Sequence, residues 1–144
     1  MFSDKWDTRF LDLAEKVGGW SKDPSTKVGA VIVRPDRTIA SVGFNGFPRH
    51  VADLYTDRED KLLRTVHAEL NAILSARESL KGYHLYVSPL FPCSHCAAAI
   101  IQSGIKYVNA RMGPPRPEWQ KSFDAAAQMF KEAAIDRKST RLNS

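Results

Sequence analysis

Two short motifs constrain this chain more than any other feature of its sequence. They are His67-Ala68-Glu69 and, 23 residues after Glu69, Pro92-Cys93-Ser94-His95-Cys96. Cys93 and Cys96 are the only cysteines in the sequence, and residues three apart share one face of a helix. Two thiolates and the His67 imidazole form a three-ligand zinc set that leaves the fourth tetrahedral position to water. The motifs therefore predict a catalytic zinc centre.

Glu69 is the candidate proton carrier at this centre. Zinc can lower the pKa of a bound water to about 7, and a nearby carboxylate can then move its protons. On a regular helix, however, residues two apart lie about 200° apart, so His67 and Glu69 would not share a face. They can converge only at the N-terminal end of a helix. We therefore expect a helix to begin close to Val66, with irregular backbone before it.

Two other interpretations of the cysteine pair stay open at this point. A C-x-x-C motif can be redox-active, although Pro92 and the distant His67 fit zinc better. A structural zinc would need a fourth ligand, which His50, His84 or His95 could supply. We expect His95 to point away from the metal and His84 to be an ordinary residue of a sheet.

Hydrophobic periodicity predicts a single α/β domain with a mixed sheet. An amphipathic helix, an antiparallel hairpin and a long polar connection precede the first motif. The strands on either side of the second motif are joined by a helix and should be parallel. The expected helices are 6–17, one from about 66 to near 82, 93–102 and 119–133, and the expected strands are 27–33, 39–44, 84–88 and 105–109.

Charge and targeting signals limit the function classes. The chain has a formal charge of +5 and a pI of about 9.4, but residues 136–144 contribute three positive charges and one negative, which leaves +3 for residues 1–135. This balance suits a small anionic substrate better than a nucleic-acid polymer. The sequence has neither a signal-peptide pattern nor an apolar run that could span a membrane. We therefore expect a cytoplasmic protein.

Several stretches of the chain resemble the deoxycytidylate (dCMP) deaminases of the cytidine deaminase-like superfamily. The resemblance covers most of residues 4–134, and the H-x-E and P-C-x-x-C pair is the zinc deaminase pattern. Free cytidine deaminases have Cys where His67 stands, and tRNA adenosine deaminases usually have Glu where Phe91 stands. The most specific stretches are Ser21–Ala30, Gly43–Arg49, His67–Leu74, Leu90–Cys96 and Ile100–Lys106.

The resemblance implies a three-layer α/β/α fold and the hydrolysis of dCMP to dUMP and ammonia. It assigns zinc to His67, Cys93 and Cys96, and proton transfer to Glu69. Asn45 would contact the sugar, although a short polar residue in a Gly-flanked turn is as often structural. The remaining substrate contacts would be Lys27, Ser25, Thr26, Arg49 and Ala68, of which Lys27 is the first candidate for the phosphate.

Family resemblance also implies regulation and assembly. Many relatives are hexamers that are activated by dCTP, with Mg²⁺, and inhibited by dTTP, so we expect a homo-oligomer and an effector site near residues 45–60. Two alternatives remain open. One is a deaminase of another pyrimidine or of a tRNA base, and the other is a non-catalytic, zinc-stabilised binding module. Glu69 argues against the second, because a structural zinc needs no general base.

Residues 136–144 depart from the family pattern. Family members generally continue with a fifth strand, whereas Asp136-Arg137-Lys138-Ser139-Thr140-Arg141-Leu142-Asn143-Ser144 resembles the translation of a sequencing adapter. It contains one Leu in nine residues and no strand alternation. We therefore expect residues 1–135 to form the catalytic domain, and residues 136–144 to be a disordered, non-native tail that replaces the fifth strand.

Overall fold

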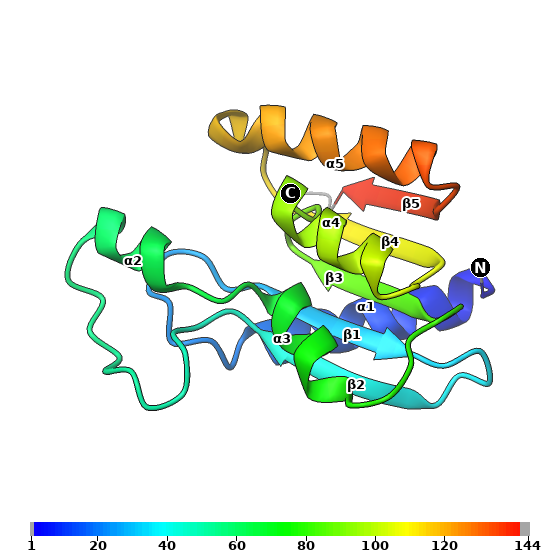
Figure 1. The fold of residues 1–144 in the computed structure, drawn as a ribbon, viewed down its shortest axis with the longest axis horizontal. Helices are drawn as coiled ribbons and strands as arrows, with labels where there is room; N and C mark the ends of the chain where they lie inside the picture. Colours follow the sequence, from blue (N-terminus) through cyan, green and yellow to red (C-terminus); the bar gives the residue numbers. More distant parts are fainter. Residues whose placement is uncertain (1, 142–144) are drawn as a thin grey trace.

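The computed structural model describes residues 2–141 and forms one mixed sheet with helices on both faces (Figure 1). No helix among these residues is both long enough and apolar enough to cross a membrane. In chain order the elements are α1 (Asp4–Gly18), β1 (Gly29–Val33), β2 (Ile39–Phe44), α2 (Arg58–Arg64), α3 (Ala68–Ala76), β3 (His84–Ser88), α4 (Ser94–Gln102), β4 (Tyr107–Met112), the 3-10 turn η1 (Pro117–Trp119), α5 (Gln120–Glu132) and β5 (Asp136–Arg141).

The sheet has the strand order β2-β1-β3-β4-β5. β1 pairs antiparallel with both β2 and β3, while β3, β4 and β5 are parallel. The predicted hairpin and the predicted parallel pair are therefore confirmed. All residues of β1 and β3 are buried, because helices cover both of their faces.

Alternate residues of β1 belong to two separate cores, which defines the three layers. Val31 and Val33 pack with Phe10, Leu11 and other apolar residues of α1 on one face. Ala30 and Ile32 belong to the larger core formed with α3, α4 and α5 on the other face. Figure 1 accordingly shows α1 on the far side of the sheet from α3 and α4. The three-layer α/β/α prediction is confirmed.

The expectation of a disordered tail and a lost fifth strand is wrong for Asp136–Arg141. These residues pair with β4 in parallel register, from Tyr107 opposite Asp136 to Met112 opposite Arg141. The pairing uses backbone groups at the open edge of β4, so an exposed edge strand needs no apolar alternation. Residues 142–144 of the predicted tail lie outside the described residues, and the non-native origin of the segment stays a prediction.

The helix expected from about residue 66 to near residue 82 is shorter in the structure, and a separate short helix, α2, precedes it. α2 ends at Arg64, Thr65–His67 are not helical, and α3 runs only from Ala68 to Ala76. Leu63 lies on α2 and is 80% exposed, so it takes no part in the face that α3 buries. The predicted irregular backbone before the motif helix is confirmed.

His84 is buried on the α1 face of the sheet, between two aromatic rings. Its ring stacks on Phe2 and Tyr107, with centroid distances of 3.9 and 4.2 Å. Its Nδ1 atom has no hydrogen-bond partner among the described residues. Burial is the main reason that the pKa of His84 falls from 6.5 to about 4.

This pKa predicts that His84 makes the fold sensitive to acid. The unfolded chain takes up a proton near pH 6.5, whereas the folded chain resists protonation down to about pH 4, so stability falls as the pH drops through that window. The loss amounts to about 2 kcal/mol between about pH 7 and about pH 5. His84→Phe keeps the stack and removes the titration, so urea unfolding should show a smaller loss than in the wild type.

The exposed His50 provides a matched control, and its left-handed φ of 69° favours Asn as the replacement. His50→Asn should keep the wild-type pH dependence. Equal losses of stability in the wild type and His84→Phe would contradict the role of His84.

Candidate functional site

The candidate site lies where the N-termini of α3 and α4 meet. His67 is the N-cap of α3 and Cys93 is the N-cap of α4, and both have extended backbone with no side-chain capping bond. Their side chains are therefore free to face each other. Two local features hold α3 in place: Val66 forms a β-bridge with Gly46, and a Cβ on Gly43 would lie 2.5 Å from the Ala68 carbonyl oxygen. Only glycine allows α3 to approach β2 so closely.

The three predicted metal ligands come together at this junction. The Sγ atoms of Cys93 and Cys96 each lie 3.4 Å from His67 Nδ1, and all three ligand atoms lie within 4.8 Å of one another. Tetrahedral zinc bonds of about 2.0–2.3 Å place neighbouring ligand atoms roughly 3.5–3.8 Å apart. The donor set and its spacing therefore fit zinc.

Among residues 2–141, no fourth histidine, cysteine or carboxylate belongs to this cluster. His50 and His95 are exposed, and His84 lies in the core on the α1 face. This agrees with the prediction that His95 points away and that His84 is a sheet residue. A three-ligand site is typical of catalytic rather than structural zinc, and a nearby imidazole is no part of a simple redox pair.

Hydrogen bonds among Cys93, Cys96 and His67 favour a negatively charged thiolate, which is suited to binding a cation. A hydrogen bond from the Cys96 thiol, and then the His67 imidazole, lower the pKa of Cys93, while the shared proton raises the pKa of Cys96. The interaction with Cys93 also raises the pKa of His67. Thiolates are the form that binds zinc, so a thiolate is already favoured at Cys93.

Glu69 lies beside the ligands in the first turn of α3 and is only 4% exposed. Burial raises the pKa of its carboxyl group from 4.5 to about 7. A group that titrates near neutral pH can both accept and donate a proton. On a regular helix, His67 and Glu69 would lie about 200° apart. Because the backbone of His67 is extended instead of helical, the side chains of His67 and Glu69 both line one pocket.

The pocket extends from this cluster to a polar mouth. The buried residues Ala68, Glu69 and Cys93 form its inner end with His67, and the exposed residues Arg58 of α2 and Glu118 of η1 lie at its mouth. The apolar side chains in the lining, such as Leu90, Phe91 and Phe123, suit a planar base. The lining residues are Asp23, Thr26, Val28, Asn45, Arg58, Lys61, Leu62, Thr65, His67, Ala68, Glu69, Leu90, Phe91, Cys93, Arg116, Glu118, Trp119 and Phe123.

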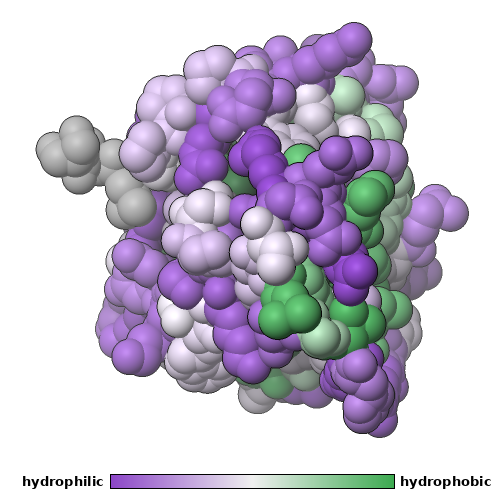
Figure 2. Space-filling view, turned by 90° about the vertical axis from the view of Figure 1, so that its left-hand side faces the viewer, coloured by the Kyte–Doolittle hydropathy of each residue, from purple (hydrophilic) through white to green (hydrophobic). Residues whose placement is uncertain are grey.

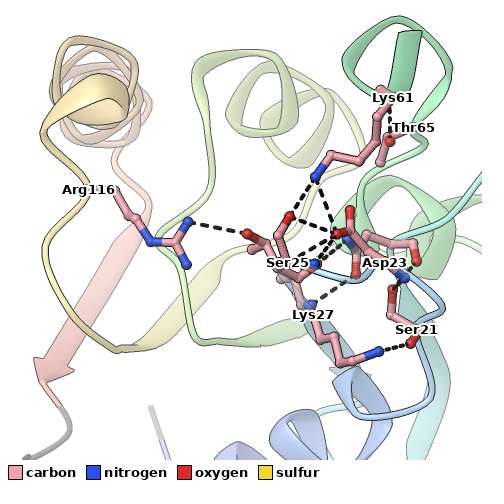
Figure 3. Close-up of polar contacts among 10 residues, drawn as sticks. Ser21, Asp23, Ser25, Lys27, Lys61, Thr65 and Arg116 are labelled. Carbon is pink, nitrogen blue, oxygen red and sulfur yellow. Dashed lines mark hydrogen bonds and ion pairs between the residues drawn. The ribbon is translucent and has the colours of Figure 1, made fainter. Parts of the chain in front are cut away.

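Of the predicted sugar and phosphate contacts, Asn45 and Thr26 line the pocket. The Asn45 amide also has a structural role, because Oδ1 accepts from Val28 N (2.9 Å) and Nδ2 donates to the Thr26 carbonyl oxygen (2.8 Å). Arg49 is exposed outside the pocket. Lys27 is also outside the lining, and its ammonium donates to the Ser21 carbonyl oxygen instead (Figure 3).

Sequence reasoning missed the polar network at the mouth, which is centred on Asp23 (Figure 3). Burial opposes ionisation of Asp23, but the backbone N–H groups of Thr26 and Ser25, together with Lys61, lower its pKa overall. Lys61 Nζ lies 3.3 Å from Asp23 Oδ1 and donates to Ser25 Oγ at 2.6 Å. Only the tertiary fold reveals this contact, since Lys61 is 38 residues from Asp23 along the chain.

The segment from residue 47 to α2 projects beyond the end of the sheet (Figure 1). Figure 2, which looks at this end of the molecule, shows a mostly hydrophilic face with a hydrophobic patch toward one side. Leu54, Leu62 and Leu63 of this segment are largely exposed, and no residue of α2 is buried. Lys61 is therefore the main polar tie between α2 and the body of the domain.

Comparison with known proteins places this geometry in context. Residues 4–112 match the family described as the cytidine and deoxycytidylate deaminase zinc-binding region. An uncharacterized deaminase from the luxG 3′ region of Aliivibrio fischeri is 47% identical over 139 residues, covering 92% of this chain and 91% of the relative. The crystal structure of a cyanophage S-TIM5 dCMP deaminase with dCMP and dUMP has the same fold, with a TM-score of 0.78, 24% identity and coverage of 97% of this chain and 100% of the other.

Two curated relatives with a named activity are longer than this chain. A probable deoxycytidylate deaminase from Caenorhabditis elegans is 49% identical over 107 residues, which cover 69% of this chain. The human deoxycytidylate deaminase is 38% identical over 113 residues, which cover 72%. The chain spans 54% and 63% of the length of these two relatives.

Proposed function

This chain belongs to the cytidine and deoxycytidylate deaminase family, and we propose that it hydrolyses dCMP to dUMP and ammonia at a zinc centre. The observation that carries the proposal is the cluster of His67, Cys93 and Cys96 beside the buried Glu69. Support for the substrate comes from the relatives that are named deoxycytidylate deaminases. The product would feed thymidylate synthesis.

His67, Cys93 and Cys96 would hold the metal, and bound zinc would supply the Lewis acidity that makes water a nucleophile at neutral pH. Glu69 accepts a proton from the attacking water and delivers it to N3 of the cytosine ring. The water oxygen bonds to C4, and Glu69 passes the second water proton to the leaving amino group. The C4–N bond then breaks, and ammonia leaves with both protons accounted for.

The rest of the pocket would orient the nucleotide. Asn45 Oδ1 and Nδ2 each make one hydrogen bond to the backbone, of Val28 and Thr26 respectively. The second lone pair of Oδ1 or the second N–H of Nδ2 would contact the sugar. Ala68, which is fully buried between His67 and Glu69 at the inner end, would contact the base. Thr26 is the one predicted phosphate contact that both lines the pocket and accepts a hydrogen bond from a cation there, Arg116.

The first prediction separates chemistry from metal binding. Glu69→Gln keeps the shape of the side chain but cannot take up a proton, so it should retain stoichiometric zinc and lose at least about 100-fold in kcat. The assay measures ammonia release from dCMP, cytidine, CMP, dCTP and tRNA, with zinc measured in the same samples. We expect dCMP to be the best substrate.

The matched control for this experiment is Glu78→Gln, because Glu78 pairs with Arg34 at the surface, outside the pocket. This variant should deaminate like the wild type. Turnover that survives in Glu69→Gln would contradict the mechanism. Activity confined to a tRNA base, or to the unphosphorylated nucleoside, would contradict the substrate.

Regulation and assembly rest on the family resemblance. We propose a cytoplasmic homo-oligomer, with a hexamer as the expected form, which dCTP with Mg²⁺ activates and dTTP inhibits. The projecting segment before α2 is the expected effector region. In the same ammonia assay, dCTP should raise the initial rate at low dCMP. Identical hyperbolic curves with and without dCTP would contradict activation.

A further inference from the structure

A hydroxyl group of α5 reaches the helix end that carries two of the zinc ligands. Ser122 Oγ accepts a hydrogen bond from the backbone N–H of Ser94 at 2.8 Å and donates to Ser94 Oγ at 3.2 Å. Ser94 is the first residue of α4 and directly follows the ligand Cys93. We propose that Ser122 is a positioning residue of the zinc centre, because it fixes the helical turn that presents Cys93 and Cys96. This inference rests on the proposed function, since it concerns the same metal site.

The first turn of α4 needs an outside partner because its N-cap residue is a metal ligand. The first N–H groups of a helix have no partner within the helix, and an N-cap side chain ordinarily accepts from one of them. In α4 the N-cap is Cys93, whose Sγ atom lies 3.4 Å from His67 Nδ1 and makes no capping bond. Ser122, 28 residues from Ser94 along the chain, supplies an acceptor for one of these N–H groups instead. The thiol of Cys93 is thereby left to the metal.

α5 also packs against the chain just before Cys93. Phe91 is buried, and its ring meets those of Phe123 and Phe130 edge-on, with centroid distances of 6.5 and 5.9 Å. Apolar packing is not directional, whereas a hydrogen bond also favours one orientation of its two partners. The aromatic contacts therefore hold this segment against α5, and the hydrogen bonds of Ser122 set the orientation of the turn that follows.

The orientation of this turn decides the geometry of the metal site. Cys93 and Cys96 both belong to the start of α4, whereas His67 is the N-cap of α3. A rotation of the α4 end moves two of the three ligand atoms together, relative to the third. A zinc site tolerates errors of only about 0.2 Å in its ligand distances, so such a movement weakens metal binding.

Ser122 does not contact the substrate in this account. Its neighbours Trp119 and Phe123 line the pocket, but Ser122 does not belong to the lining. Its hydroxyl proton is donated to Ser94 Oγ, and its oxygen accepts from Ser94 N. The residue therefore acts through the ligands, and its substitution should change the affinity for zinc.

The test measures the Kd for zinc by competition with a chromogenic chelator, and the Tm of the zinc-free protein in parallel. Ser122→Ala removes the acceptor of the Ser94 N–H, so the Kd for zinc should rise by about 10-fold. Ser122→Thr keeps a hydroxyl and should bring the Kd back to within about threefold of the wild type, because threonine caps a helix nearly as well as serine. With Co²⁺ in place of zinc, the visible absorption bands should change in Ser122→Ala and return in Ser122→Thr.

The control variant is Ser103→Ala, at the opposite end of α4. Ser103 is the C-cap of this helix, and its hydroxyl donates to the Ile100 carbonyl oxygen. This variant should bind zinc like the wild type. An unchanged Kd for zinc in Ser122→Ala would overturn the proposal even if the Tm falls, because that pattern describes a purely structural serine. A loss of affinity that Ser122→Thr fails to restore would also overturn it.

The proposed function fails separately from this inference. A protein whose Kd for zinc depends on Ser122, but which releases no ammonia from dCMP, would support the positioning role and contradict the deaminase activity. A protein that releases ammonia from dCMP and keeps the wild-type Kd for zinc in Ser122→Ala would support the activity and overturn the positioning role.

Discussion

The meeting of two helix N-termini is the constraint on which the rest of this structure depends. Three ligand atoms from His67, Cys93 and Cys96 must lie about 3.5 Å apart, and they come from two different helices. α3 can reach this position only because Gly43 has no side chain and because the chain is not helical between Thr65 and His67. The same break places Glu69 beside the cluster, where burial raises its pKa to about 7.

A second, polar scaffold forms the outer half of the pocket. Asp23 accepts from backbone groups of its own turn, while Asn45 holds the backbone of Thr26 and Val28. A loop without regular structure becomes well defined in this way, because its buried polar groups find partners. This scaffold explains why Asn45 is buried, and it positions the hydroxyl of Thr26 that receives Arg116.

The inner half of the site was predictable from the sequence, because its chemistry is encoded in local spacing. Cys93 and Cys96 are three residues apart, and the geometry of His67 and Glu69 required a helix start that the structure confirms. The mouth was not predictable in this way. Arg116 lies 90 residues from Thr26 along the chain, and nothing in a proline-rich connection marks one arginine as a residue that lines the pocket.

The same distinction, between features encoded in local sequence and features made by distant residues, applies to the fold. The buried strand β1 is apolar throughout and the buried strand β3 is apolar at its centre, so the hydrophobic pattern was enough to predict both. β5 is polar and exposed, and it joins the sheet through backbone pairing with β4. A pattern of apolar side chains could not predict this pairing. α2 was missed because it buries none of its residues, and an unburied helix has no amphipathic signature.

X-ray absorption at the zinc edge of the purified protein tests the central claim most directly. The account predicts one zinc per chain, with two sulfur ligands at about 2.3 Å and two nitrogen or oxygen ligands at about 2.0–2.1 Å, as expected for two cysteines, one histidine and one non-protein ligand. A protein that binds no zinc, or a zinc with a sulfur count other than two, would contradict it.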